Sequence, residues 1–210
     1  GKRYVFIEEY VYKTKKGHLS VMEVDELGNH TDPIIILERD THLSYPFVFF
    51  SEGKYYMIPE SVASMTIELY EAVEFPYKWE HKLNLMENVS AVDTTLIRRG
   101  NKWWLFVGIA ENKDVAAHND SAYNTELYLF YASDFATDKW QPHPMNPIVS
   151  DVRNARPAGA LFERDGKLYR PAQDCAKRYG HSVRINEVVT LSECKYDEKV
   201  HLPITLLELQ

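Results

Sequence analysis

The side chains best suited to chemistry in this sequence include a carboxylate in a stretch of apolar residues. Asp93 follows Ala91-Val92 and precedes two threonines, so the sequence predicts that it lies in a buried strand. A buried carboxylate is costly unless it is paired or faces a wet cavity. Carboxylates whose pKa values are shifted by their surroundings are frequent at functional sites. We favour a functional, catalytic role for Asp93, and the alternative is a salt-bridged residue at the end of a strand.

Arg156 is the second candidate, in the stretch Ala155-Arg156-Pro157-Ala158-Gly159. A guanidinium group can form paired hydrogen bonds with a carboxylate, a phosphate or neighbouring sugar hydroxyls. Arg156 can therefore bind substrate, pair with Asp93, or form a structural salt bridge. The sequence leaves these three interpretations open.

Further polar residues recur at related places along the chain. Arg170, Gln173 and Asp174 lie within one predicted strand, and Glu60 occupies the position of Gln173 in an earlier repeat. We expect all four to bind substrate, and the alternative is that repeated polar residues tie neighbouring repeats together.

His42 and Tyr45 begin another strand-like stretch, His42-Leu43-Ser44-Tyr45-Pro46-Phe47. A tyrosine ring can stack on a pyranose ring while its hydroxyl forms a hydrogen bond, so Tyr45 is a candidate for substrate binding. His42 is a candidate for the same site, where it would carry a proton; the alternative is a structural histidine.

These residues must be positioned by a repeated structure. A turn followed by Lys and aromatic residues recurs with Lys2, Lys54, Lys102 and Lys167, at spacings of 52, 48 and 65 residues. After each copy comes a strand of alternating polarity, which is typical of a half-buried strand. These second strands are expected over residues 18–25, 66–72, 126–132 and 182–191.

Other strands complete each repeat. We expect a preceding strand over residues 44–49, 91–97 and 155–162, and an outer strand near 75–79, 138–140 and 203–209. Four short strands in about 50 residues form one blade of a β-propeller. The sequence therefore predicts an all-β, five-bladed β-propeller in a single domain over residues 1–210, of which about four blades are visible and both ends are incomplete.

Several short motifs then show a resemblance, and they lie in order along nearly the whole chain. They are His42-Leu43-Ser44-Tyr45-Pro46-Phe47, Met57-Ile58-Pro59-Glu60-Ser61, Trp103-Trp104-Leu105-Phe106, Ala155-Arg156-Pro157-Ala158-Gly159, and Tyr169-Arg170-Pro171-Ala172-Gln173-Asp174-Cys175 with Tyr179-Gly180. The sequence resembles the five-bladed propellers of the arabinanase, levansucrase and invertase superfamily, which includes glycoside hydrolase families 43 and 32. It is most similar to the N-terminal propeller domain of glucosamine inositolphosphorylceramide transferases and their bacterial relatives.

The resemblance implies a site where carboxylates meet at the centre of one face, acting as base or nucleophile, as acid, and as a positioning group. On this pattern Asp93 takes the place of the middle carboxylate. Where the general acid is expected, the sequence has Arg156-Pro157-Ala158-Gly159, and arginine does not release its proton near neutral pH.

Three functions follow from these observations. The first is a carbohydrate-recognition domain that is accessory to glycan or glycoconjugate processing. Such a domain would bind a carbohydrate or glycoconjugate ligand, and a partner domain or chain would complete its propeller. The second is an active glycoside hydrolase of the family 43-like type, in which Glu60 or Asp174 supplies the acid. The third is a propeller that binds protein partners, because one fold hosts many functions.

Composition, charge and motif spacing argue against other classes of function. The net charge of −7 and the scattered basic residues argue against nucleic acid, and no apolar run is long enough to span a membrane. Histidines and cysteines lack the spacing of a metal site, and no glycine-rich nucleotide loop occurs, so we expect no metal and no cofactor. Cys175 and Cys194 either pair or remain reduced. An acidic chain with no leader in the printed sequence favours the cytoplasm, and three N-x-S/T sequons only weakly indicate secretion.

Overall fold

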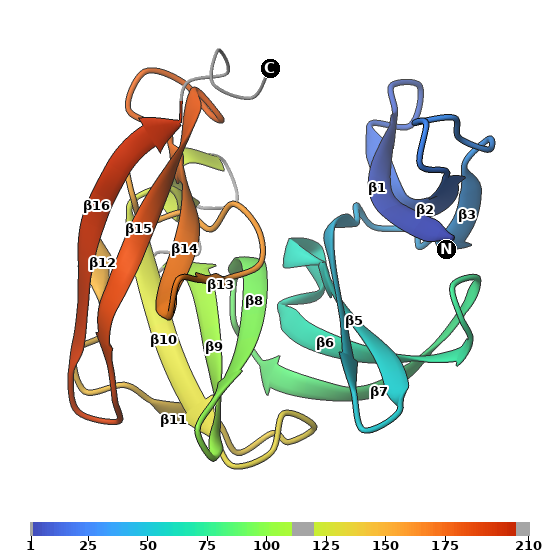
Figure 1. Cartoon of the computed structure of the whole chain (residues 1–210). Helices are drawn as coiled ribbons and strands as arrows, with labels where there is room; N and C mark the ends of the chain where they lie inside the picture. Colours follow the sequence, from blue (N-terminus) through green and yellow to red (C-terminus); the bar gives the residue numbers. More distant parts are fainter. Residues whose placement is uncertain (1, 111–119, 205–210) are drawn as a thin grey trace. The chain divides into compact units, whose positions relative to one another are not determined.

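The computed structural model describes residues 2–110 and 120–204, and in this part of the chain regular structure is almost entirely β (Figure 1). The chain divides into two compact units, residues 1–89 and 90–210. Each unit holds two antiparallel sheets, and each sheet corresponds to one of the predicted blades. The two units are described separately below.

The first unit contains a three-stranded and a four-stranded sheet. In the three-stranded sheet the order is β1 (Arg3–Val11), β2 (Lys16–Val24) and β3 (Ile34–Leu37). The four-stranded sheet follows chain order from β4 to β7. Its strands are β4 (Ser44–Ser51), β5 (Lys54–Glu60), β6 (Thr66–Glu74) and β7 (Lys78–Glu87), with the single-turn 3-10 helix η1 (Val62–Ser64) after β5.

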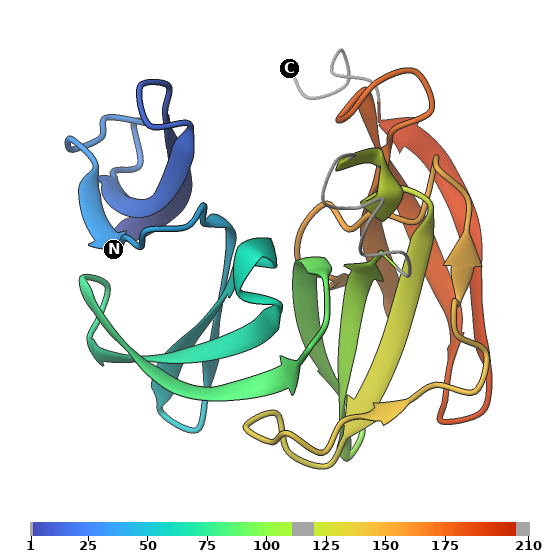
Figure 2. The same cartoon turned by 180° about the vertical axis from the view of Figure 1, so that it is seen from behind.

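The second unit contains a sheet with a divided outer edge and a regular four-stranded sheet. The first has β8 (Ala91–Arg99), β9 (Lys102–Ile109) and β10 (Glu126–Ala132), and β10 pairs with both β11 (Gln141–Pro142) and β12 (Val149–Ser150), as Figure 2 shows from behind. The 3-10 turn η2 (Asp120–Tyr123) precedes β10. The last sheet runs β13 (Phe162–Arg164), β14 (Lys167–Asp174), β15 (Ser182–Leu191) and β16 (Tyr196–Ile204).

Tight turns explain why Lys54, Lys102 and Lys167 each begin a strand. The turns Glu52-Gly53 and Asp165-Gly166 have positive φ at both residues, 51° and 79° in the first and 52° and 73° in the second. Such turns match the twist of a two-residue hairpin. At the third copy the positive φ belongs to Gly100 rather than to Asn101.

The strands that begin at the recurring turns and the strands that follow them are present, but three other predictions need correction. The outer strand predicted near 138–140 does not form there, and the short β11 begins at Gln141. Residues 155–162 form only the isolated bridge Pro157↔Ala172 and the short β13, because proline cannot donate to a ladder and Gly159 adopts a φ of 133°. The outer strand of the last sheet begins at Tyr196, well before the predicted 203–209, of which 205–209 lie outside the described residues.

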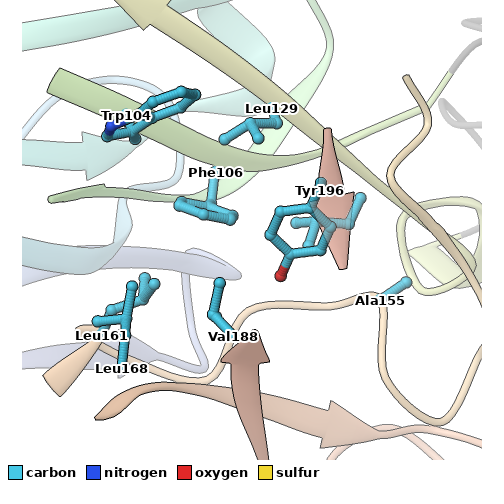
Figure 3. Close-up of a cluster of buried hydrophobic side chains, with 9 residues drawn as sticks. Trp104, Phe106, Leu129, Ala155, Leu161, Leu168, Val188 and Tyr196 are labelled. Atoms are coloured by element: carbon cyan, nitrogen blue, oxygen red, sulfur yellow. The ribbon is translucent and has the colours of Figure 1, made fainter. Parts of the chain in front are cut away.

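Each unit has its own hydrophobic core, built from both of its sheets. In the first unit Leu19 of β2 packs in one cluster with Leu43, Met57, Tyr70 and Trp79. In the second, side chains of β9, β10 and β14 to β16 converge, and Phe106, Val188 and Tyr196 point toward one another in Figure 3. Packing an apolar sheet face against its neighbour excludes water from both, which holds paired blades together.

Candidate functional site

Asp93 lies on a β-bulge in β8. The register passes from Val92↔Gly108 to Thr95↔Phe106, so Asp93 and Thr94 together oppose one residue of β9. Asp93 has a φ of 52° and is 3% exposed. A left-handed conformation is costly for most residues but tolerated by Asp, whose short side chain bonds locally. Bulges redirect side chains and occur often beside active sites.

The same bulge recurs in β4, with Tyr45 in the position of Asp93. There the register passes from Ser44↔Glu60 to Phe47↔Ile58, and Tyr45 has a φ of 42°. Pro46 suits this place because the bulge leaves a residue outside the ladder. Tyr45 and Asp93 are therefore equivalent residues of two successive blades.

Arg156 forms a buried ion pair with Asp93. Its Nε donates to Asp93 Oδ2 over 2.6 Å, and its Nη1 donates to Asn124 Oδ1 over 3.1 Å. Arg156 is 6% exposed. Of the interpretations left open by the sequence, pairing with Asp93 is the one that the structure shows.

Gln173 completes the group from the end of β14. Its Nε2 lies 3.0 Å from the carbonyl oxygen of Pro157 and 3.4 Å from Asp93 Oδ2. The backbone N–H of Gln173 donates to the Arg156 carbonyl over 2.8 Å, which ties β14 to the irregular segment that carries Arg156. We call Asp93, Asn124, Arg156 and Gln173 the central polar cluster.

One member of this cluster and one residue beside it were not among the sequence-based candidates. Asn124 follows η2, and no motif marks it. Tyr179 lies with its ring 4.7 Å from the guanidinium carbon of Arg156 and is 61% exposed. The dipeptide Tyr179-Gly180 was the available signal, because it stands in the turn that follows the Gln173-Asp174 motif.

Arg170 lies in a different network, although it is close to Gln173 in the sequence. It is 1% exposed, and its Nε and Nη2 donate to the two carboxylate oxygens of Glu198 over 2.9 and 2.7 Å. Nη2 also donates to the Asn154 carbonyl over 2.7 Å. Burial is the largest effect and lowers the pKa of Arg170, but the charge of Glu198, the neighbouring Tyr196 and the hydrogen bonds to both together raise it above its ordinary value. This geometry assigns Arg170 to the interior of the last sheet.

Asp174 is also engaged by a basic side chain. Its Oδ2 accepts from Arg184 Nη2 over 2.7 Å and from Arg184 Nε over 3.0 Å, and its Oδ1 accepts from the Ala176 N–H over 3.0 Å. Burial raises the pKa of Asp174, but these hydrogen bonds and the Arg184 charge bring it below the ordinary value. An acid held in this way donates its proton poorly near neutral pH.

The remaining candidates belong to the first unit. Nδ1 of His42 accepts from the Gly17 N–H over 2.8 Å, and Nε2 lies 3.4 Å from a carboxylate oxygen of Glu8. A Cβ on Gly17 would lie 2.6 Å from the Leu43 carbonyl oxygen and 2.8 Å from the His42 ring. His42 therefore packs closely on β2. Glu60 ends β5 opposite Ser44 and is half-buried.

Other kinds of site are limited by what the described residues contain. In residues 2–110 and 120–204 there is no group of three or more His, Cys, Asp or Glu placed to hold a metal ion. Within the same ranges no helix is long and apolar enough to cross a membrane. Cys175 is buried and Cys194 exposed, and they do not form a disulfide.

Solved structures with a similar fold define the class of protein as a β-propeller of the kind found in glycoside hydrolases. Zg3597, a family 117 glycoside hydrolase of Zobellia galactanivorans, matches 98% of this chain and 67% of its own, with a TM-score of 0.71 and 12% identity. The α-L-arabinanase of Cellvibrio cellulosa matches 95% of this chain and 74% of its own, with a TM-score of 0.63 and 13% identity. These likenesses confirm the predicted propeller fold, with four blades in this chain.

The chain belongs to the family described as glucosamine inositolphosphorylceramide transferase 1, N-terminal, whose model matches residues 1–209. It is 34% identical over 206 residues to glucosamine inositolphosphorylceramide transferase 1 of Arabidopsis thaliana, and 32% identical to the protein of that name from Oryza sativa subsp. japonica. Each match covers 97% of this chain and 26% of the relative, so the chain spans about a quarter of these proteins. The resemblance seen in the sequence is thus confirmed, and the chain is a propeller domain of this family.

Proposed function

We propose that this propeller domain recognises carbohydrate through the central polar cluster, as an accessory to the processing of a glycan or glycoconjugate. The observation that carries the proposal is the buried Asp93–Arg156 pair on a bulge with positive φ. Strained, buried polar groups persist where the surrounding structure holds them, and they gather at ligand sites. The family membership supplies the context of glycan processing.

The chemistry of the cluster suits binding better than bond cleavage. A glycoside hydrolase needs one carboxylic acid that donates a proton and a second carboxylate on the other side of the bond. Asp93 accepts hydrogen bonds from a guanidinium and an amide, and Asp174 is held by Arg184 with a lowered pKa. Amide, guanidinium and carboxylate groups together offer both donors and acceptors for sugar hydroxyls.

The test is binding of a broad panel of oligosaccharides and glycoconjugate headgroups to the full-length protein, followed by saturation-transfer NMR and calorimetry. We expect at least one glycan to bind, and Asp93→Asn to weaken it about tenfold, the loss of one charge-assisted hydrogen bond. Asp138→Asn, which removes an exposed carboxylate of the same unit, is the matched control. Folding of both variants is checked by their unfolding midpoints.

Two results would count against this function. If the folded protein retains no member of the panel, carbohydrate recognition is wrong, and a protein partner captured equally by wild type and Asp93→Asn would then favour the scaffold. If the panel shows new products by mass, and Asp93→Asn abolishes them, the domain is a hydrolase and the acid must be sought among the carboxylates of the whole protein.

A further inference from the structure

The first unit carries a polar pocket that shares no residue with the central polar cluster. Its volume is about 660 Å³, which lies within the range of about 300–1,000 Å³ that is usual for small-molecule sites. The start of β2, the connection from β3 to β4 and the turn η1 form its walls. Every lining side chain is polar, so the pocket suits a ligand that forms hydrogen bonds. The lining residues are Lys16, Glu38, Arg39, Asp40, Thr41 and Ser64.

A buried carboxylate fixes one wall of this pocket. Glu68 of β6 is 5% exposed and accepts from Arg39 Nη1 over 2.9 Å, and its second oxygen also contacts the Arg39 guanidinium. Thr66 Oγ1 and the Tyr70 hydroxyl donate to the same carboxylate, each over 2.9 Å. Lys16 Nζ donates to the Arg39 carbonyl, which ties β2 to the same segment. The wall is therefore ordered before a ligand binds, and this lowers the entropy that binding costs.

Two side chains of the pocket are available to a ligand. Within residues 2–110 and 120–204, the side chains of Asp40 and Thr41 form no hydrogen bond or ion pair with another residue. Asp40 is exposed and Thr41 is half-buried. A carboxylate accepts from two hydroxyls, and a threonine hydroxyl both donates and accepts. Adjacent hydroxyls of a sugar ring match this pair of groups.

The charges around the pocket favour a neutral ligand. Arg39 is paired with Glu68, and Lys16 Nζ lies 3.6 Å from a Glu38 oxygen. The neighbouring β1–β2 hairpin adds two exposed cations, and one more carboxylate pairs with His42. Four cations and four carboxylates leave no net charge that would attract an ion. They are Lys13, Lys15, Lys16 and Arg39, and Glu8, Glu38, Asp40 and Glu68.

An exposed pair of tyrosines lies beside the pocket on the β1–β2 hairpin, drawn in blue in Figure 1. Tyr12 is 87% exposed, and its ring lies 5.3 Å from that of Tyr10 at an angle of 80°. The Tyr10 ring lies 5.9 Å from the ring of His42, which directly follows the pocket segment. Val11, between the two tyrosines, pairs in register with Lys16 of the pocket. A tyrosine ring in this position can stack on the apolar face of a sugar.

From these observations we infer that the pocket is a second binding site of the domain, and that its ligand is a neutral sugar ring. Asp40 and Thr41 bind adjacent hydroxyls of the ring, and Tyr12 packs against its apolar face. The inference goes beyond the proposed function, because no residue of this pocket belongs to the central polar cluster.

The experiment titrates the full-length protein with short neutral oligosaccharides and with their uronic acid counterparts. Fluorotyrosine labelling gives a site-specific signal, and the signal of Tyr12 is assigned by its loss in Tyr12→Phe. Calorimetry then compares wild type with Asp40→Asn, Tyr12→Ala and Tyr12→Phe. The matched controls are Asp32→Asn, an exposed carboxylate elsewhere in the first unit, and Leu27→Ala, which removes a side chain that is 88% exposed.

We expect at least one neutral oligosaccharide to shift the Tyr12 signal, with an affinity that changes little as salt rises. Asp40→Asn should weaken this binding about tenfold through the loss of charge-assisted hydrogen bonds. Tyr12→Ala should weaken it at least about threefold, whereas Tyr12→Phe and both controls should stay within about twofold of wild type. The Tyr12 titration should be unchanged in Asp93→Asn.

A Tyr12 signal that no neutral oligosaccharide shifts would overturn the site, and so would equal affinities in wild type and Asp40→Asn. Tighter binding of the uronic acid counterparts would overturn the neutral class of ligand. The proposed function fails by a different result, in which Asp93→Asn changes no glycan affinity although the Tyr12 signal still titrates.

Discussion

Arg156 donates from Nε to Asp93 Oδ2 over 2.6 Å, although 63 positions separate the two residues in the chain and they belong to different blades. Both side chains are almost fully buried. Removing one partner of a buried pair leaves the other charge without compensation, which costs far more than the pair itself contributes.

The Asp93–Arg156 pair should therefore show strong coupling in a double-mutant cycle. We expect Asp93→Asn and Arg156→Met each to lower the free energy of unfolding by about 3–5 kcal/mol, and the double variant to lose clearly less than the sum, because no unpaired charge remains. Urea unfolding of the four proteins measures this. Strict additivity would mean that the two side chains do not interact in solution.

Gly108 should not tolerate a side chain, because it faces the residue before Asp93. A Cβ there would lie 2.9 Å from Val92 Cγ2 and 3.2 Å from the Tyr123 carbonyl oxygen. We expect Gly108→Ala to lower the free energy of unfolding by about 1–3 kcal/mol through overpacking. Val92→Ala removes the nearer methyl group, so Gly108→Ala should cost less free energy of unfolding in the Val92→Ala background than in wild type. An equal cost in both backgrounds would show that the contact with Val92 is not the cause.

Arg170 should stabilise the fold without contributing to ligand affinity. Arg170→Met leaves Glu198 unpaired in the interior, and we expect a loss of about 3–5 kcal/mol in the free energy of unfolding. The control is Lys167→Gln, which breaks the exposed pair with Glu187 in the same sheet and should cost less than about 1 kcal/mol. Glycan affinity per folded molecule should stay as in wild type, and a specific loss of affinity would return Arg170 to the binding site, as the sequence predicted.

Asp174 should make stability depend on pH in the acid range. Its folded pKa is lowered, since its hydrogen bonds and the Arg184 charge outweigh the effect of burial. Its contribution is therefore fully present above the unfolded pKa, about 3.9, and is lost as the pH falls through the lower folded value. Unfolding midpoints from pH 2 to 6 should show Asp174→Asn less stable than wild type at pH 6, with the difference shrinking toward pH 2. A constant difference would show that the charge of Asp174 is not the cause.

Much of the fold was predictable because its signal is local. The turn-Lys-aromatic repeat located β5, β9 and β14, and alternation located β6, β10 and β15, since a hairpin needs only its own turn and the period of a pleated strand. The segment 155–162 was predicted as a strand from its place in the repeat. Pro157 and Gly159 prevent a regular strand in this segment. The isolated bridge to β14 that replaces the strand depends on contacts between residues far apart in the chain.

The candidate site was predictable in part, for a similar reason. Residue types indicated Asp93, Arg156 and Gln173, because carboxylate, guanidinium and amide groups in apolar strands need partners. Arg170 and Asp174 were grouped with Gln173 because the three are close in the chain. Side chains alternate along β14, however, so Arg170 and Asp174 point away from the face that carries Gln173. Arg170 pairs with Glu198, and Asp174 pairs with Arg184. Asn124 and Tyr179 come from a turn and a loop, where the sequence has no period to follow.

By itself the sequence determined the class of fold, the blade repeat and the family resemblance, because these depend on short-range turn chemistry, strand alternation and motif order. The tertiary structure decided which polar residues meet. The bulge that gives Asp93 a φ of 52° arises from its register against β9. The Asp93–Arg156 pair and the Tyr179 contact join segments that only packing brings together. A buried charge is stable only beside its partner, and its partner is set by three-dimensional neighbours rather than by neighbours in the chain.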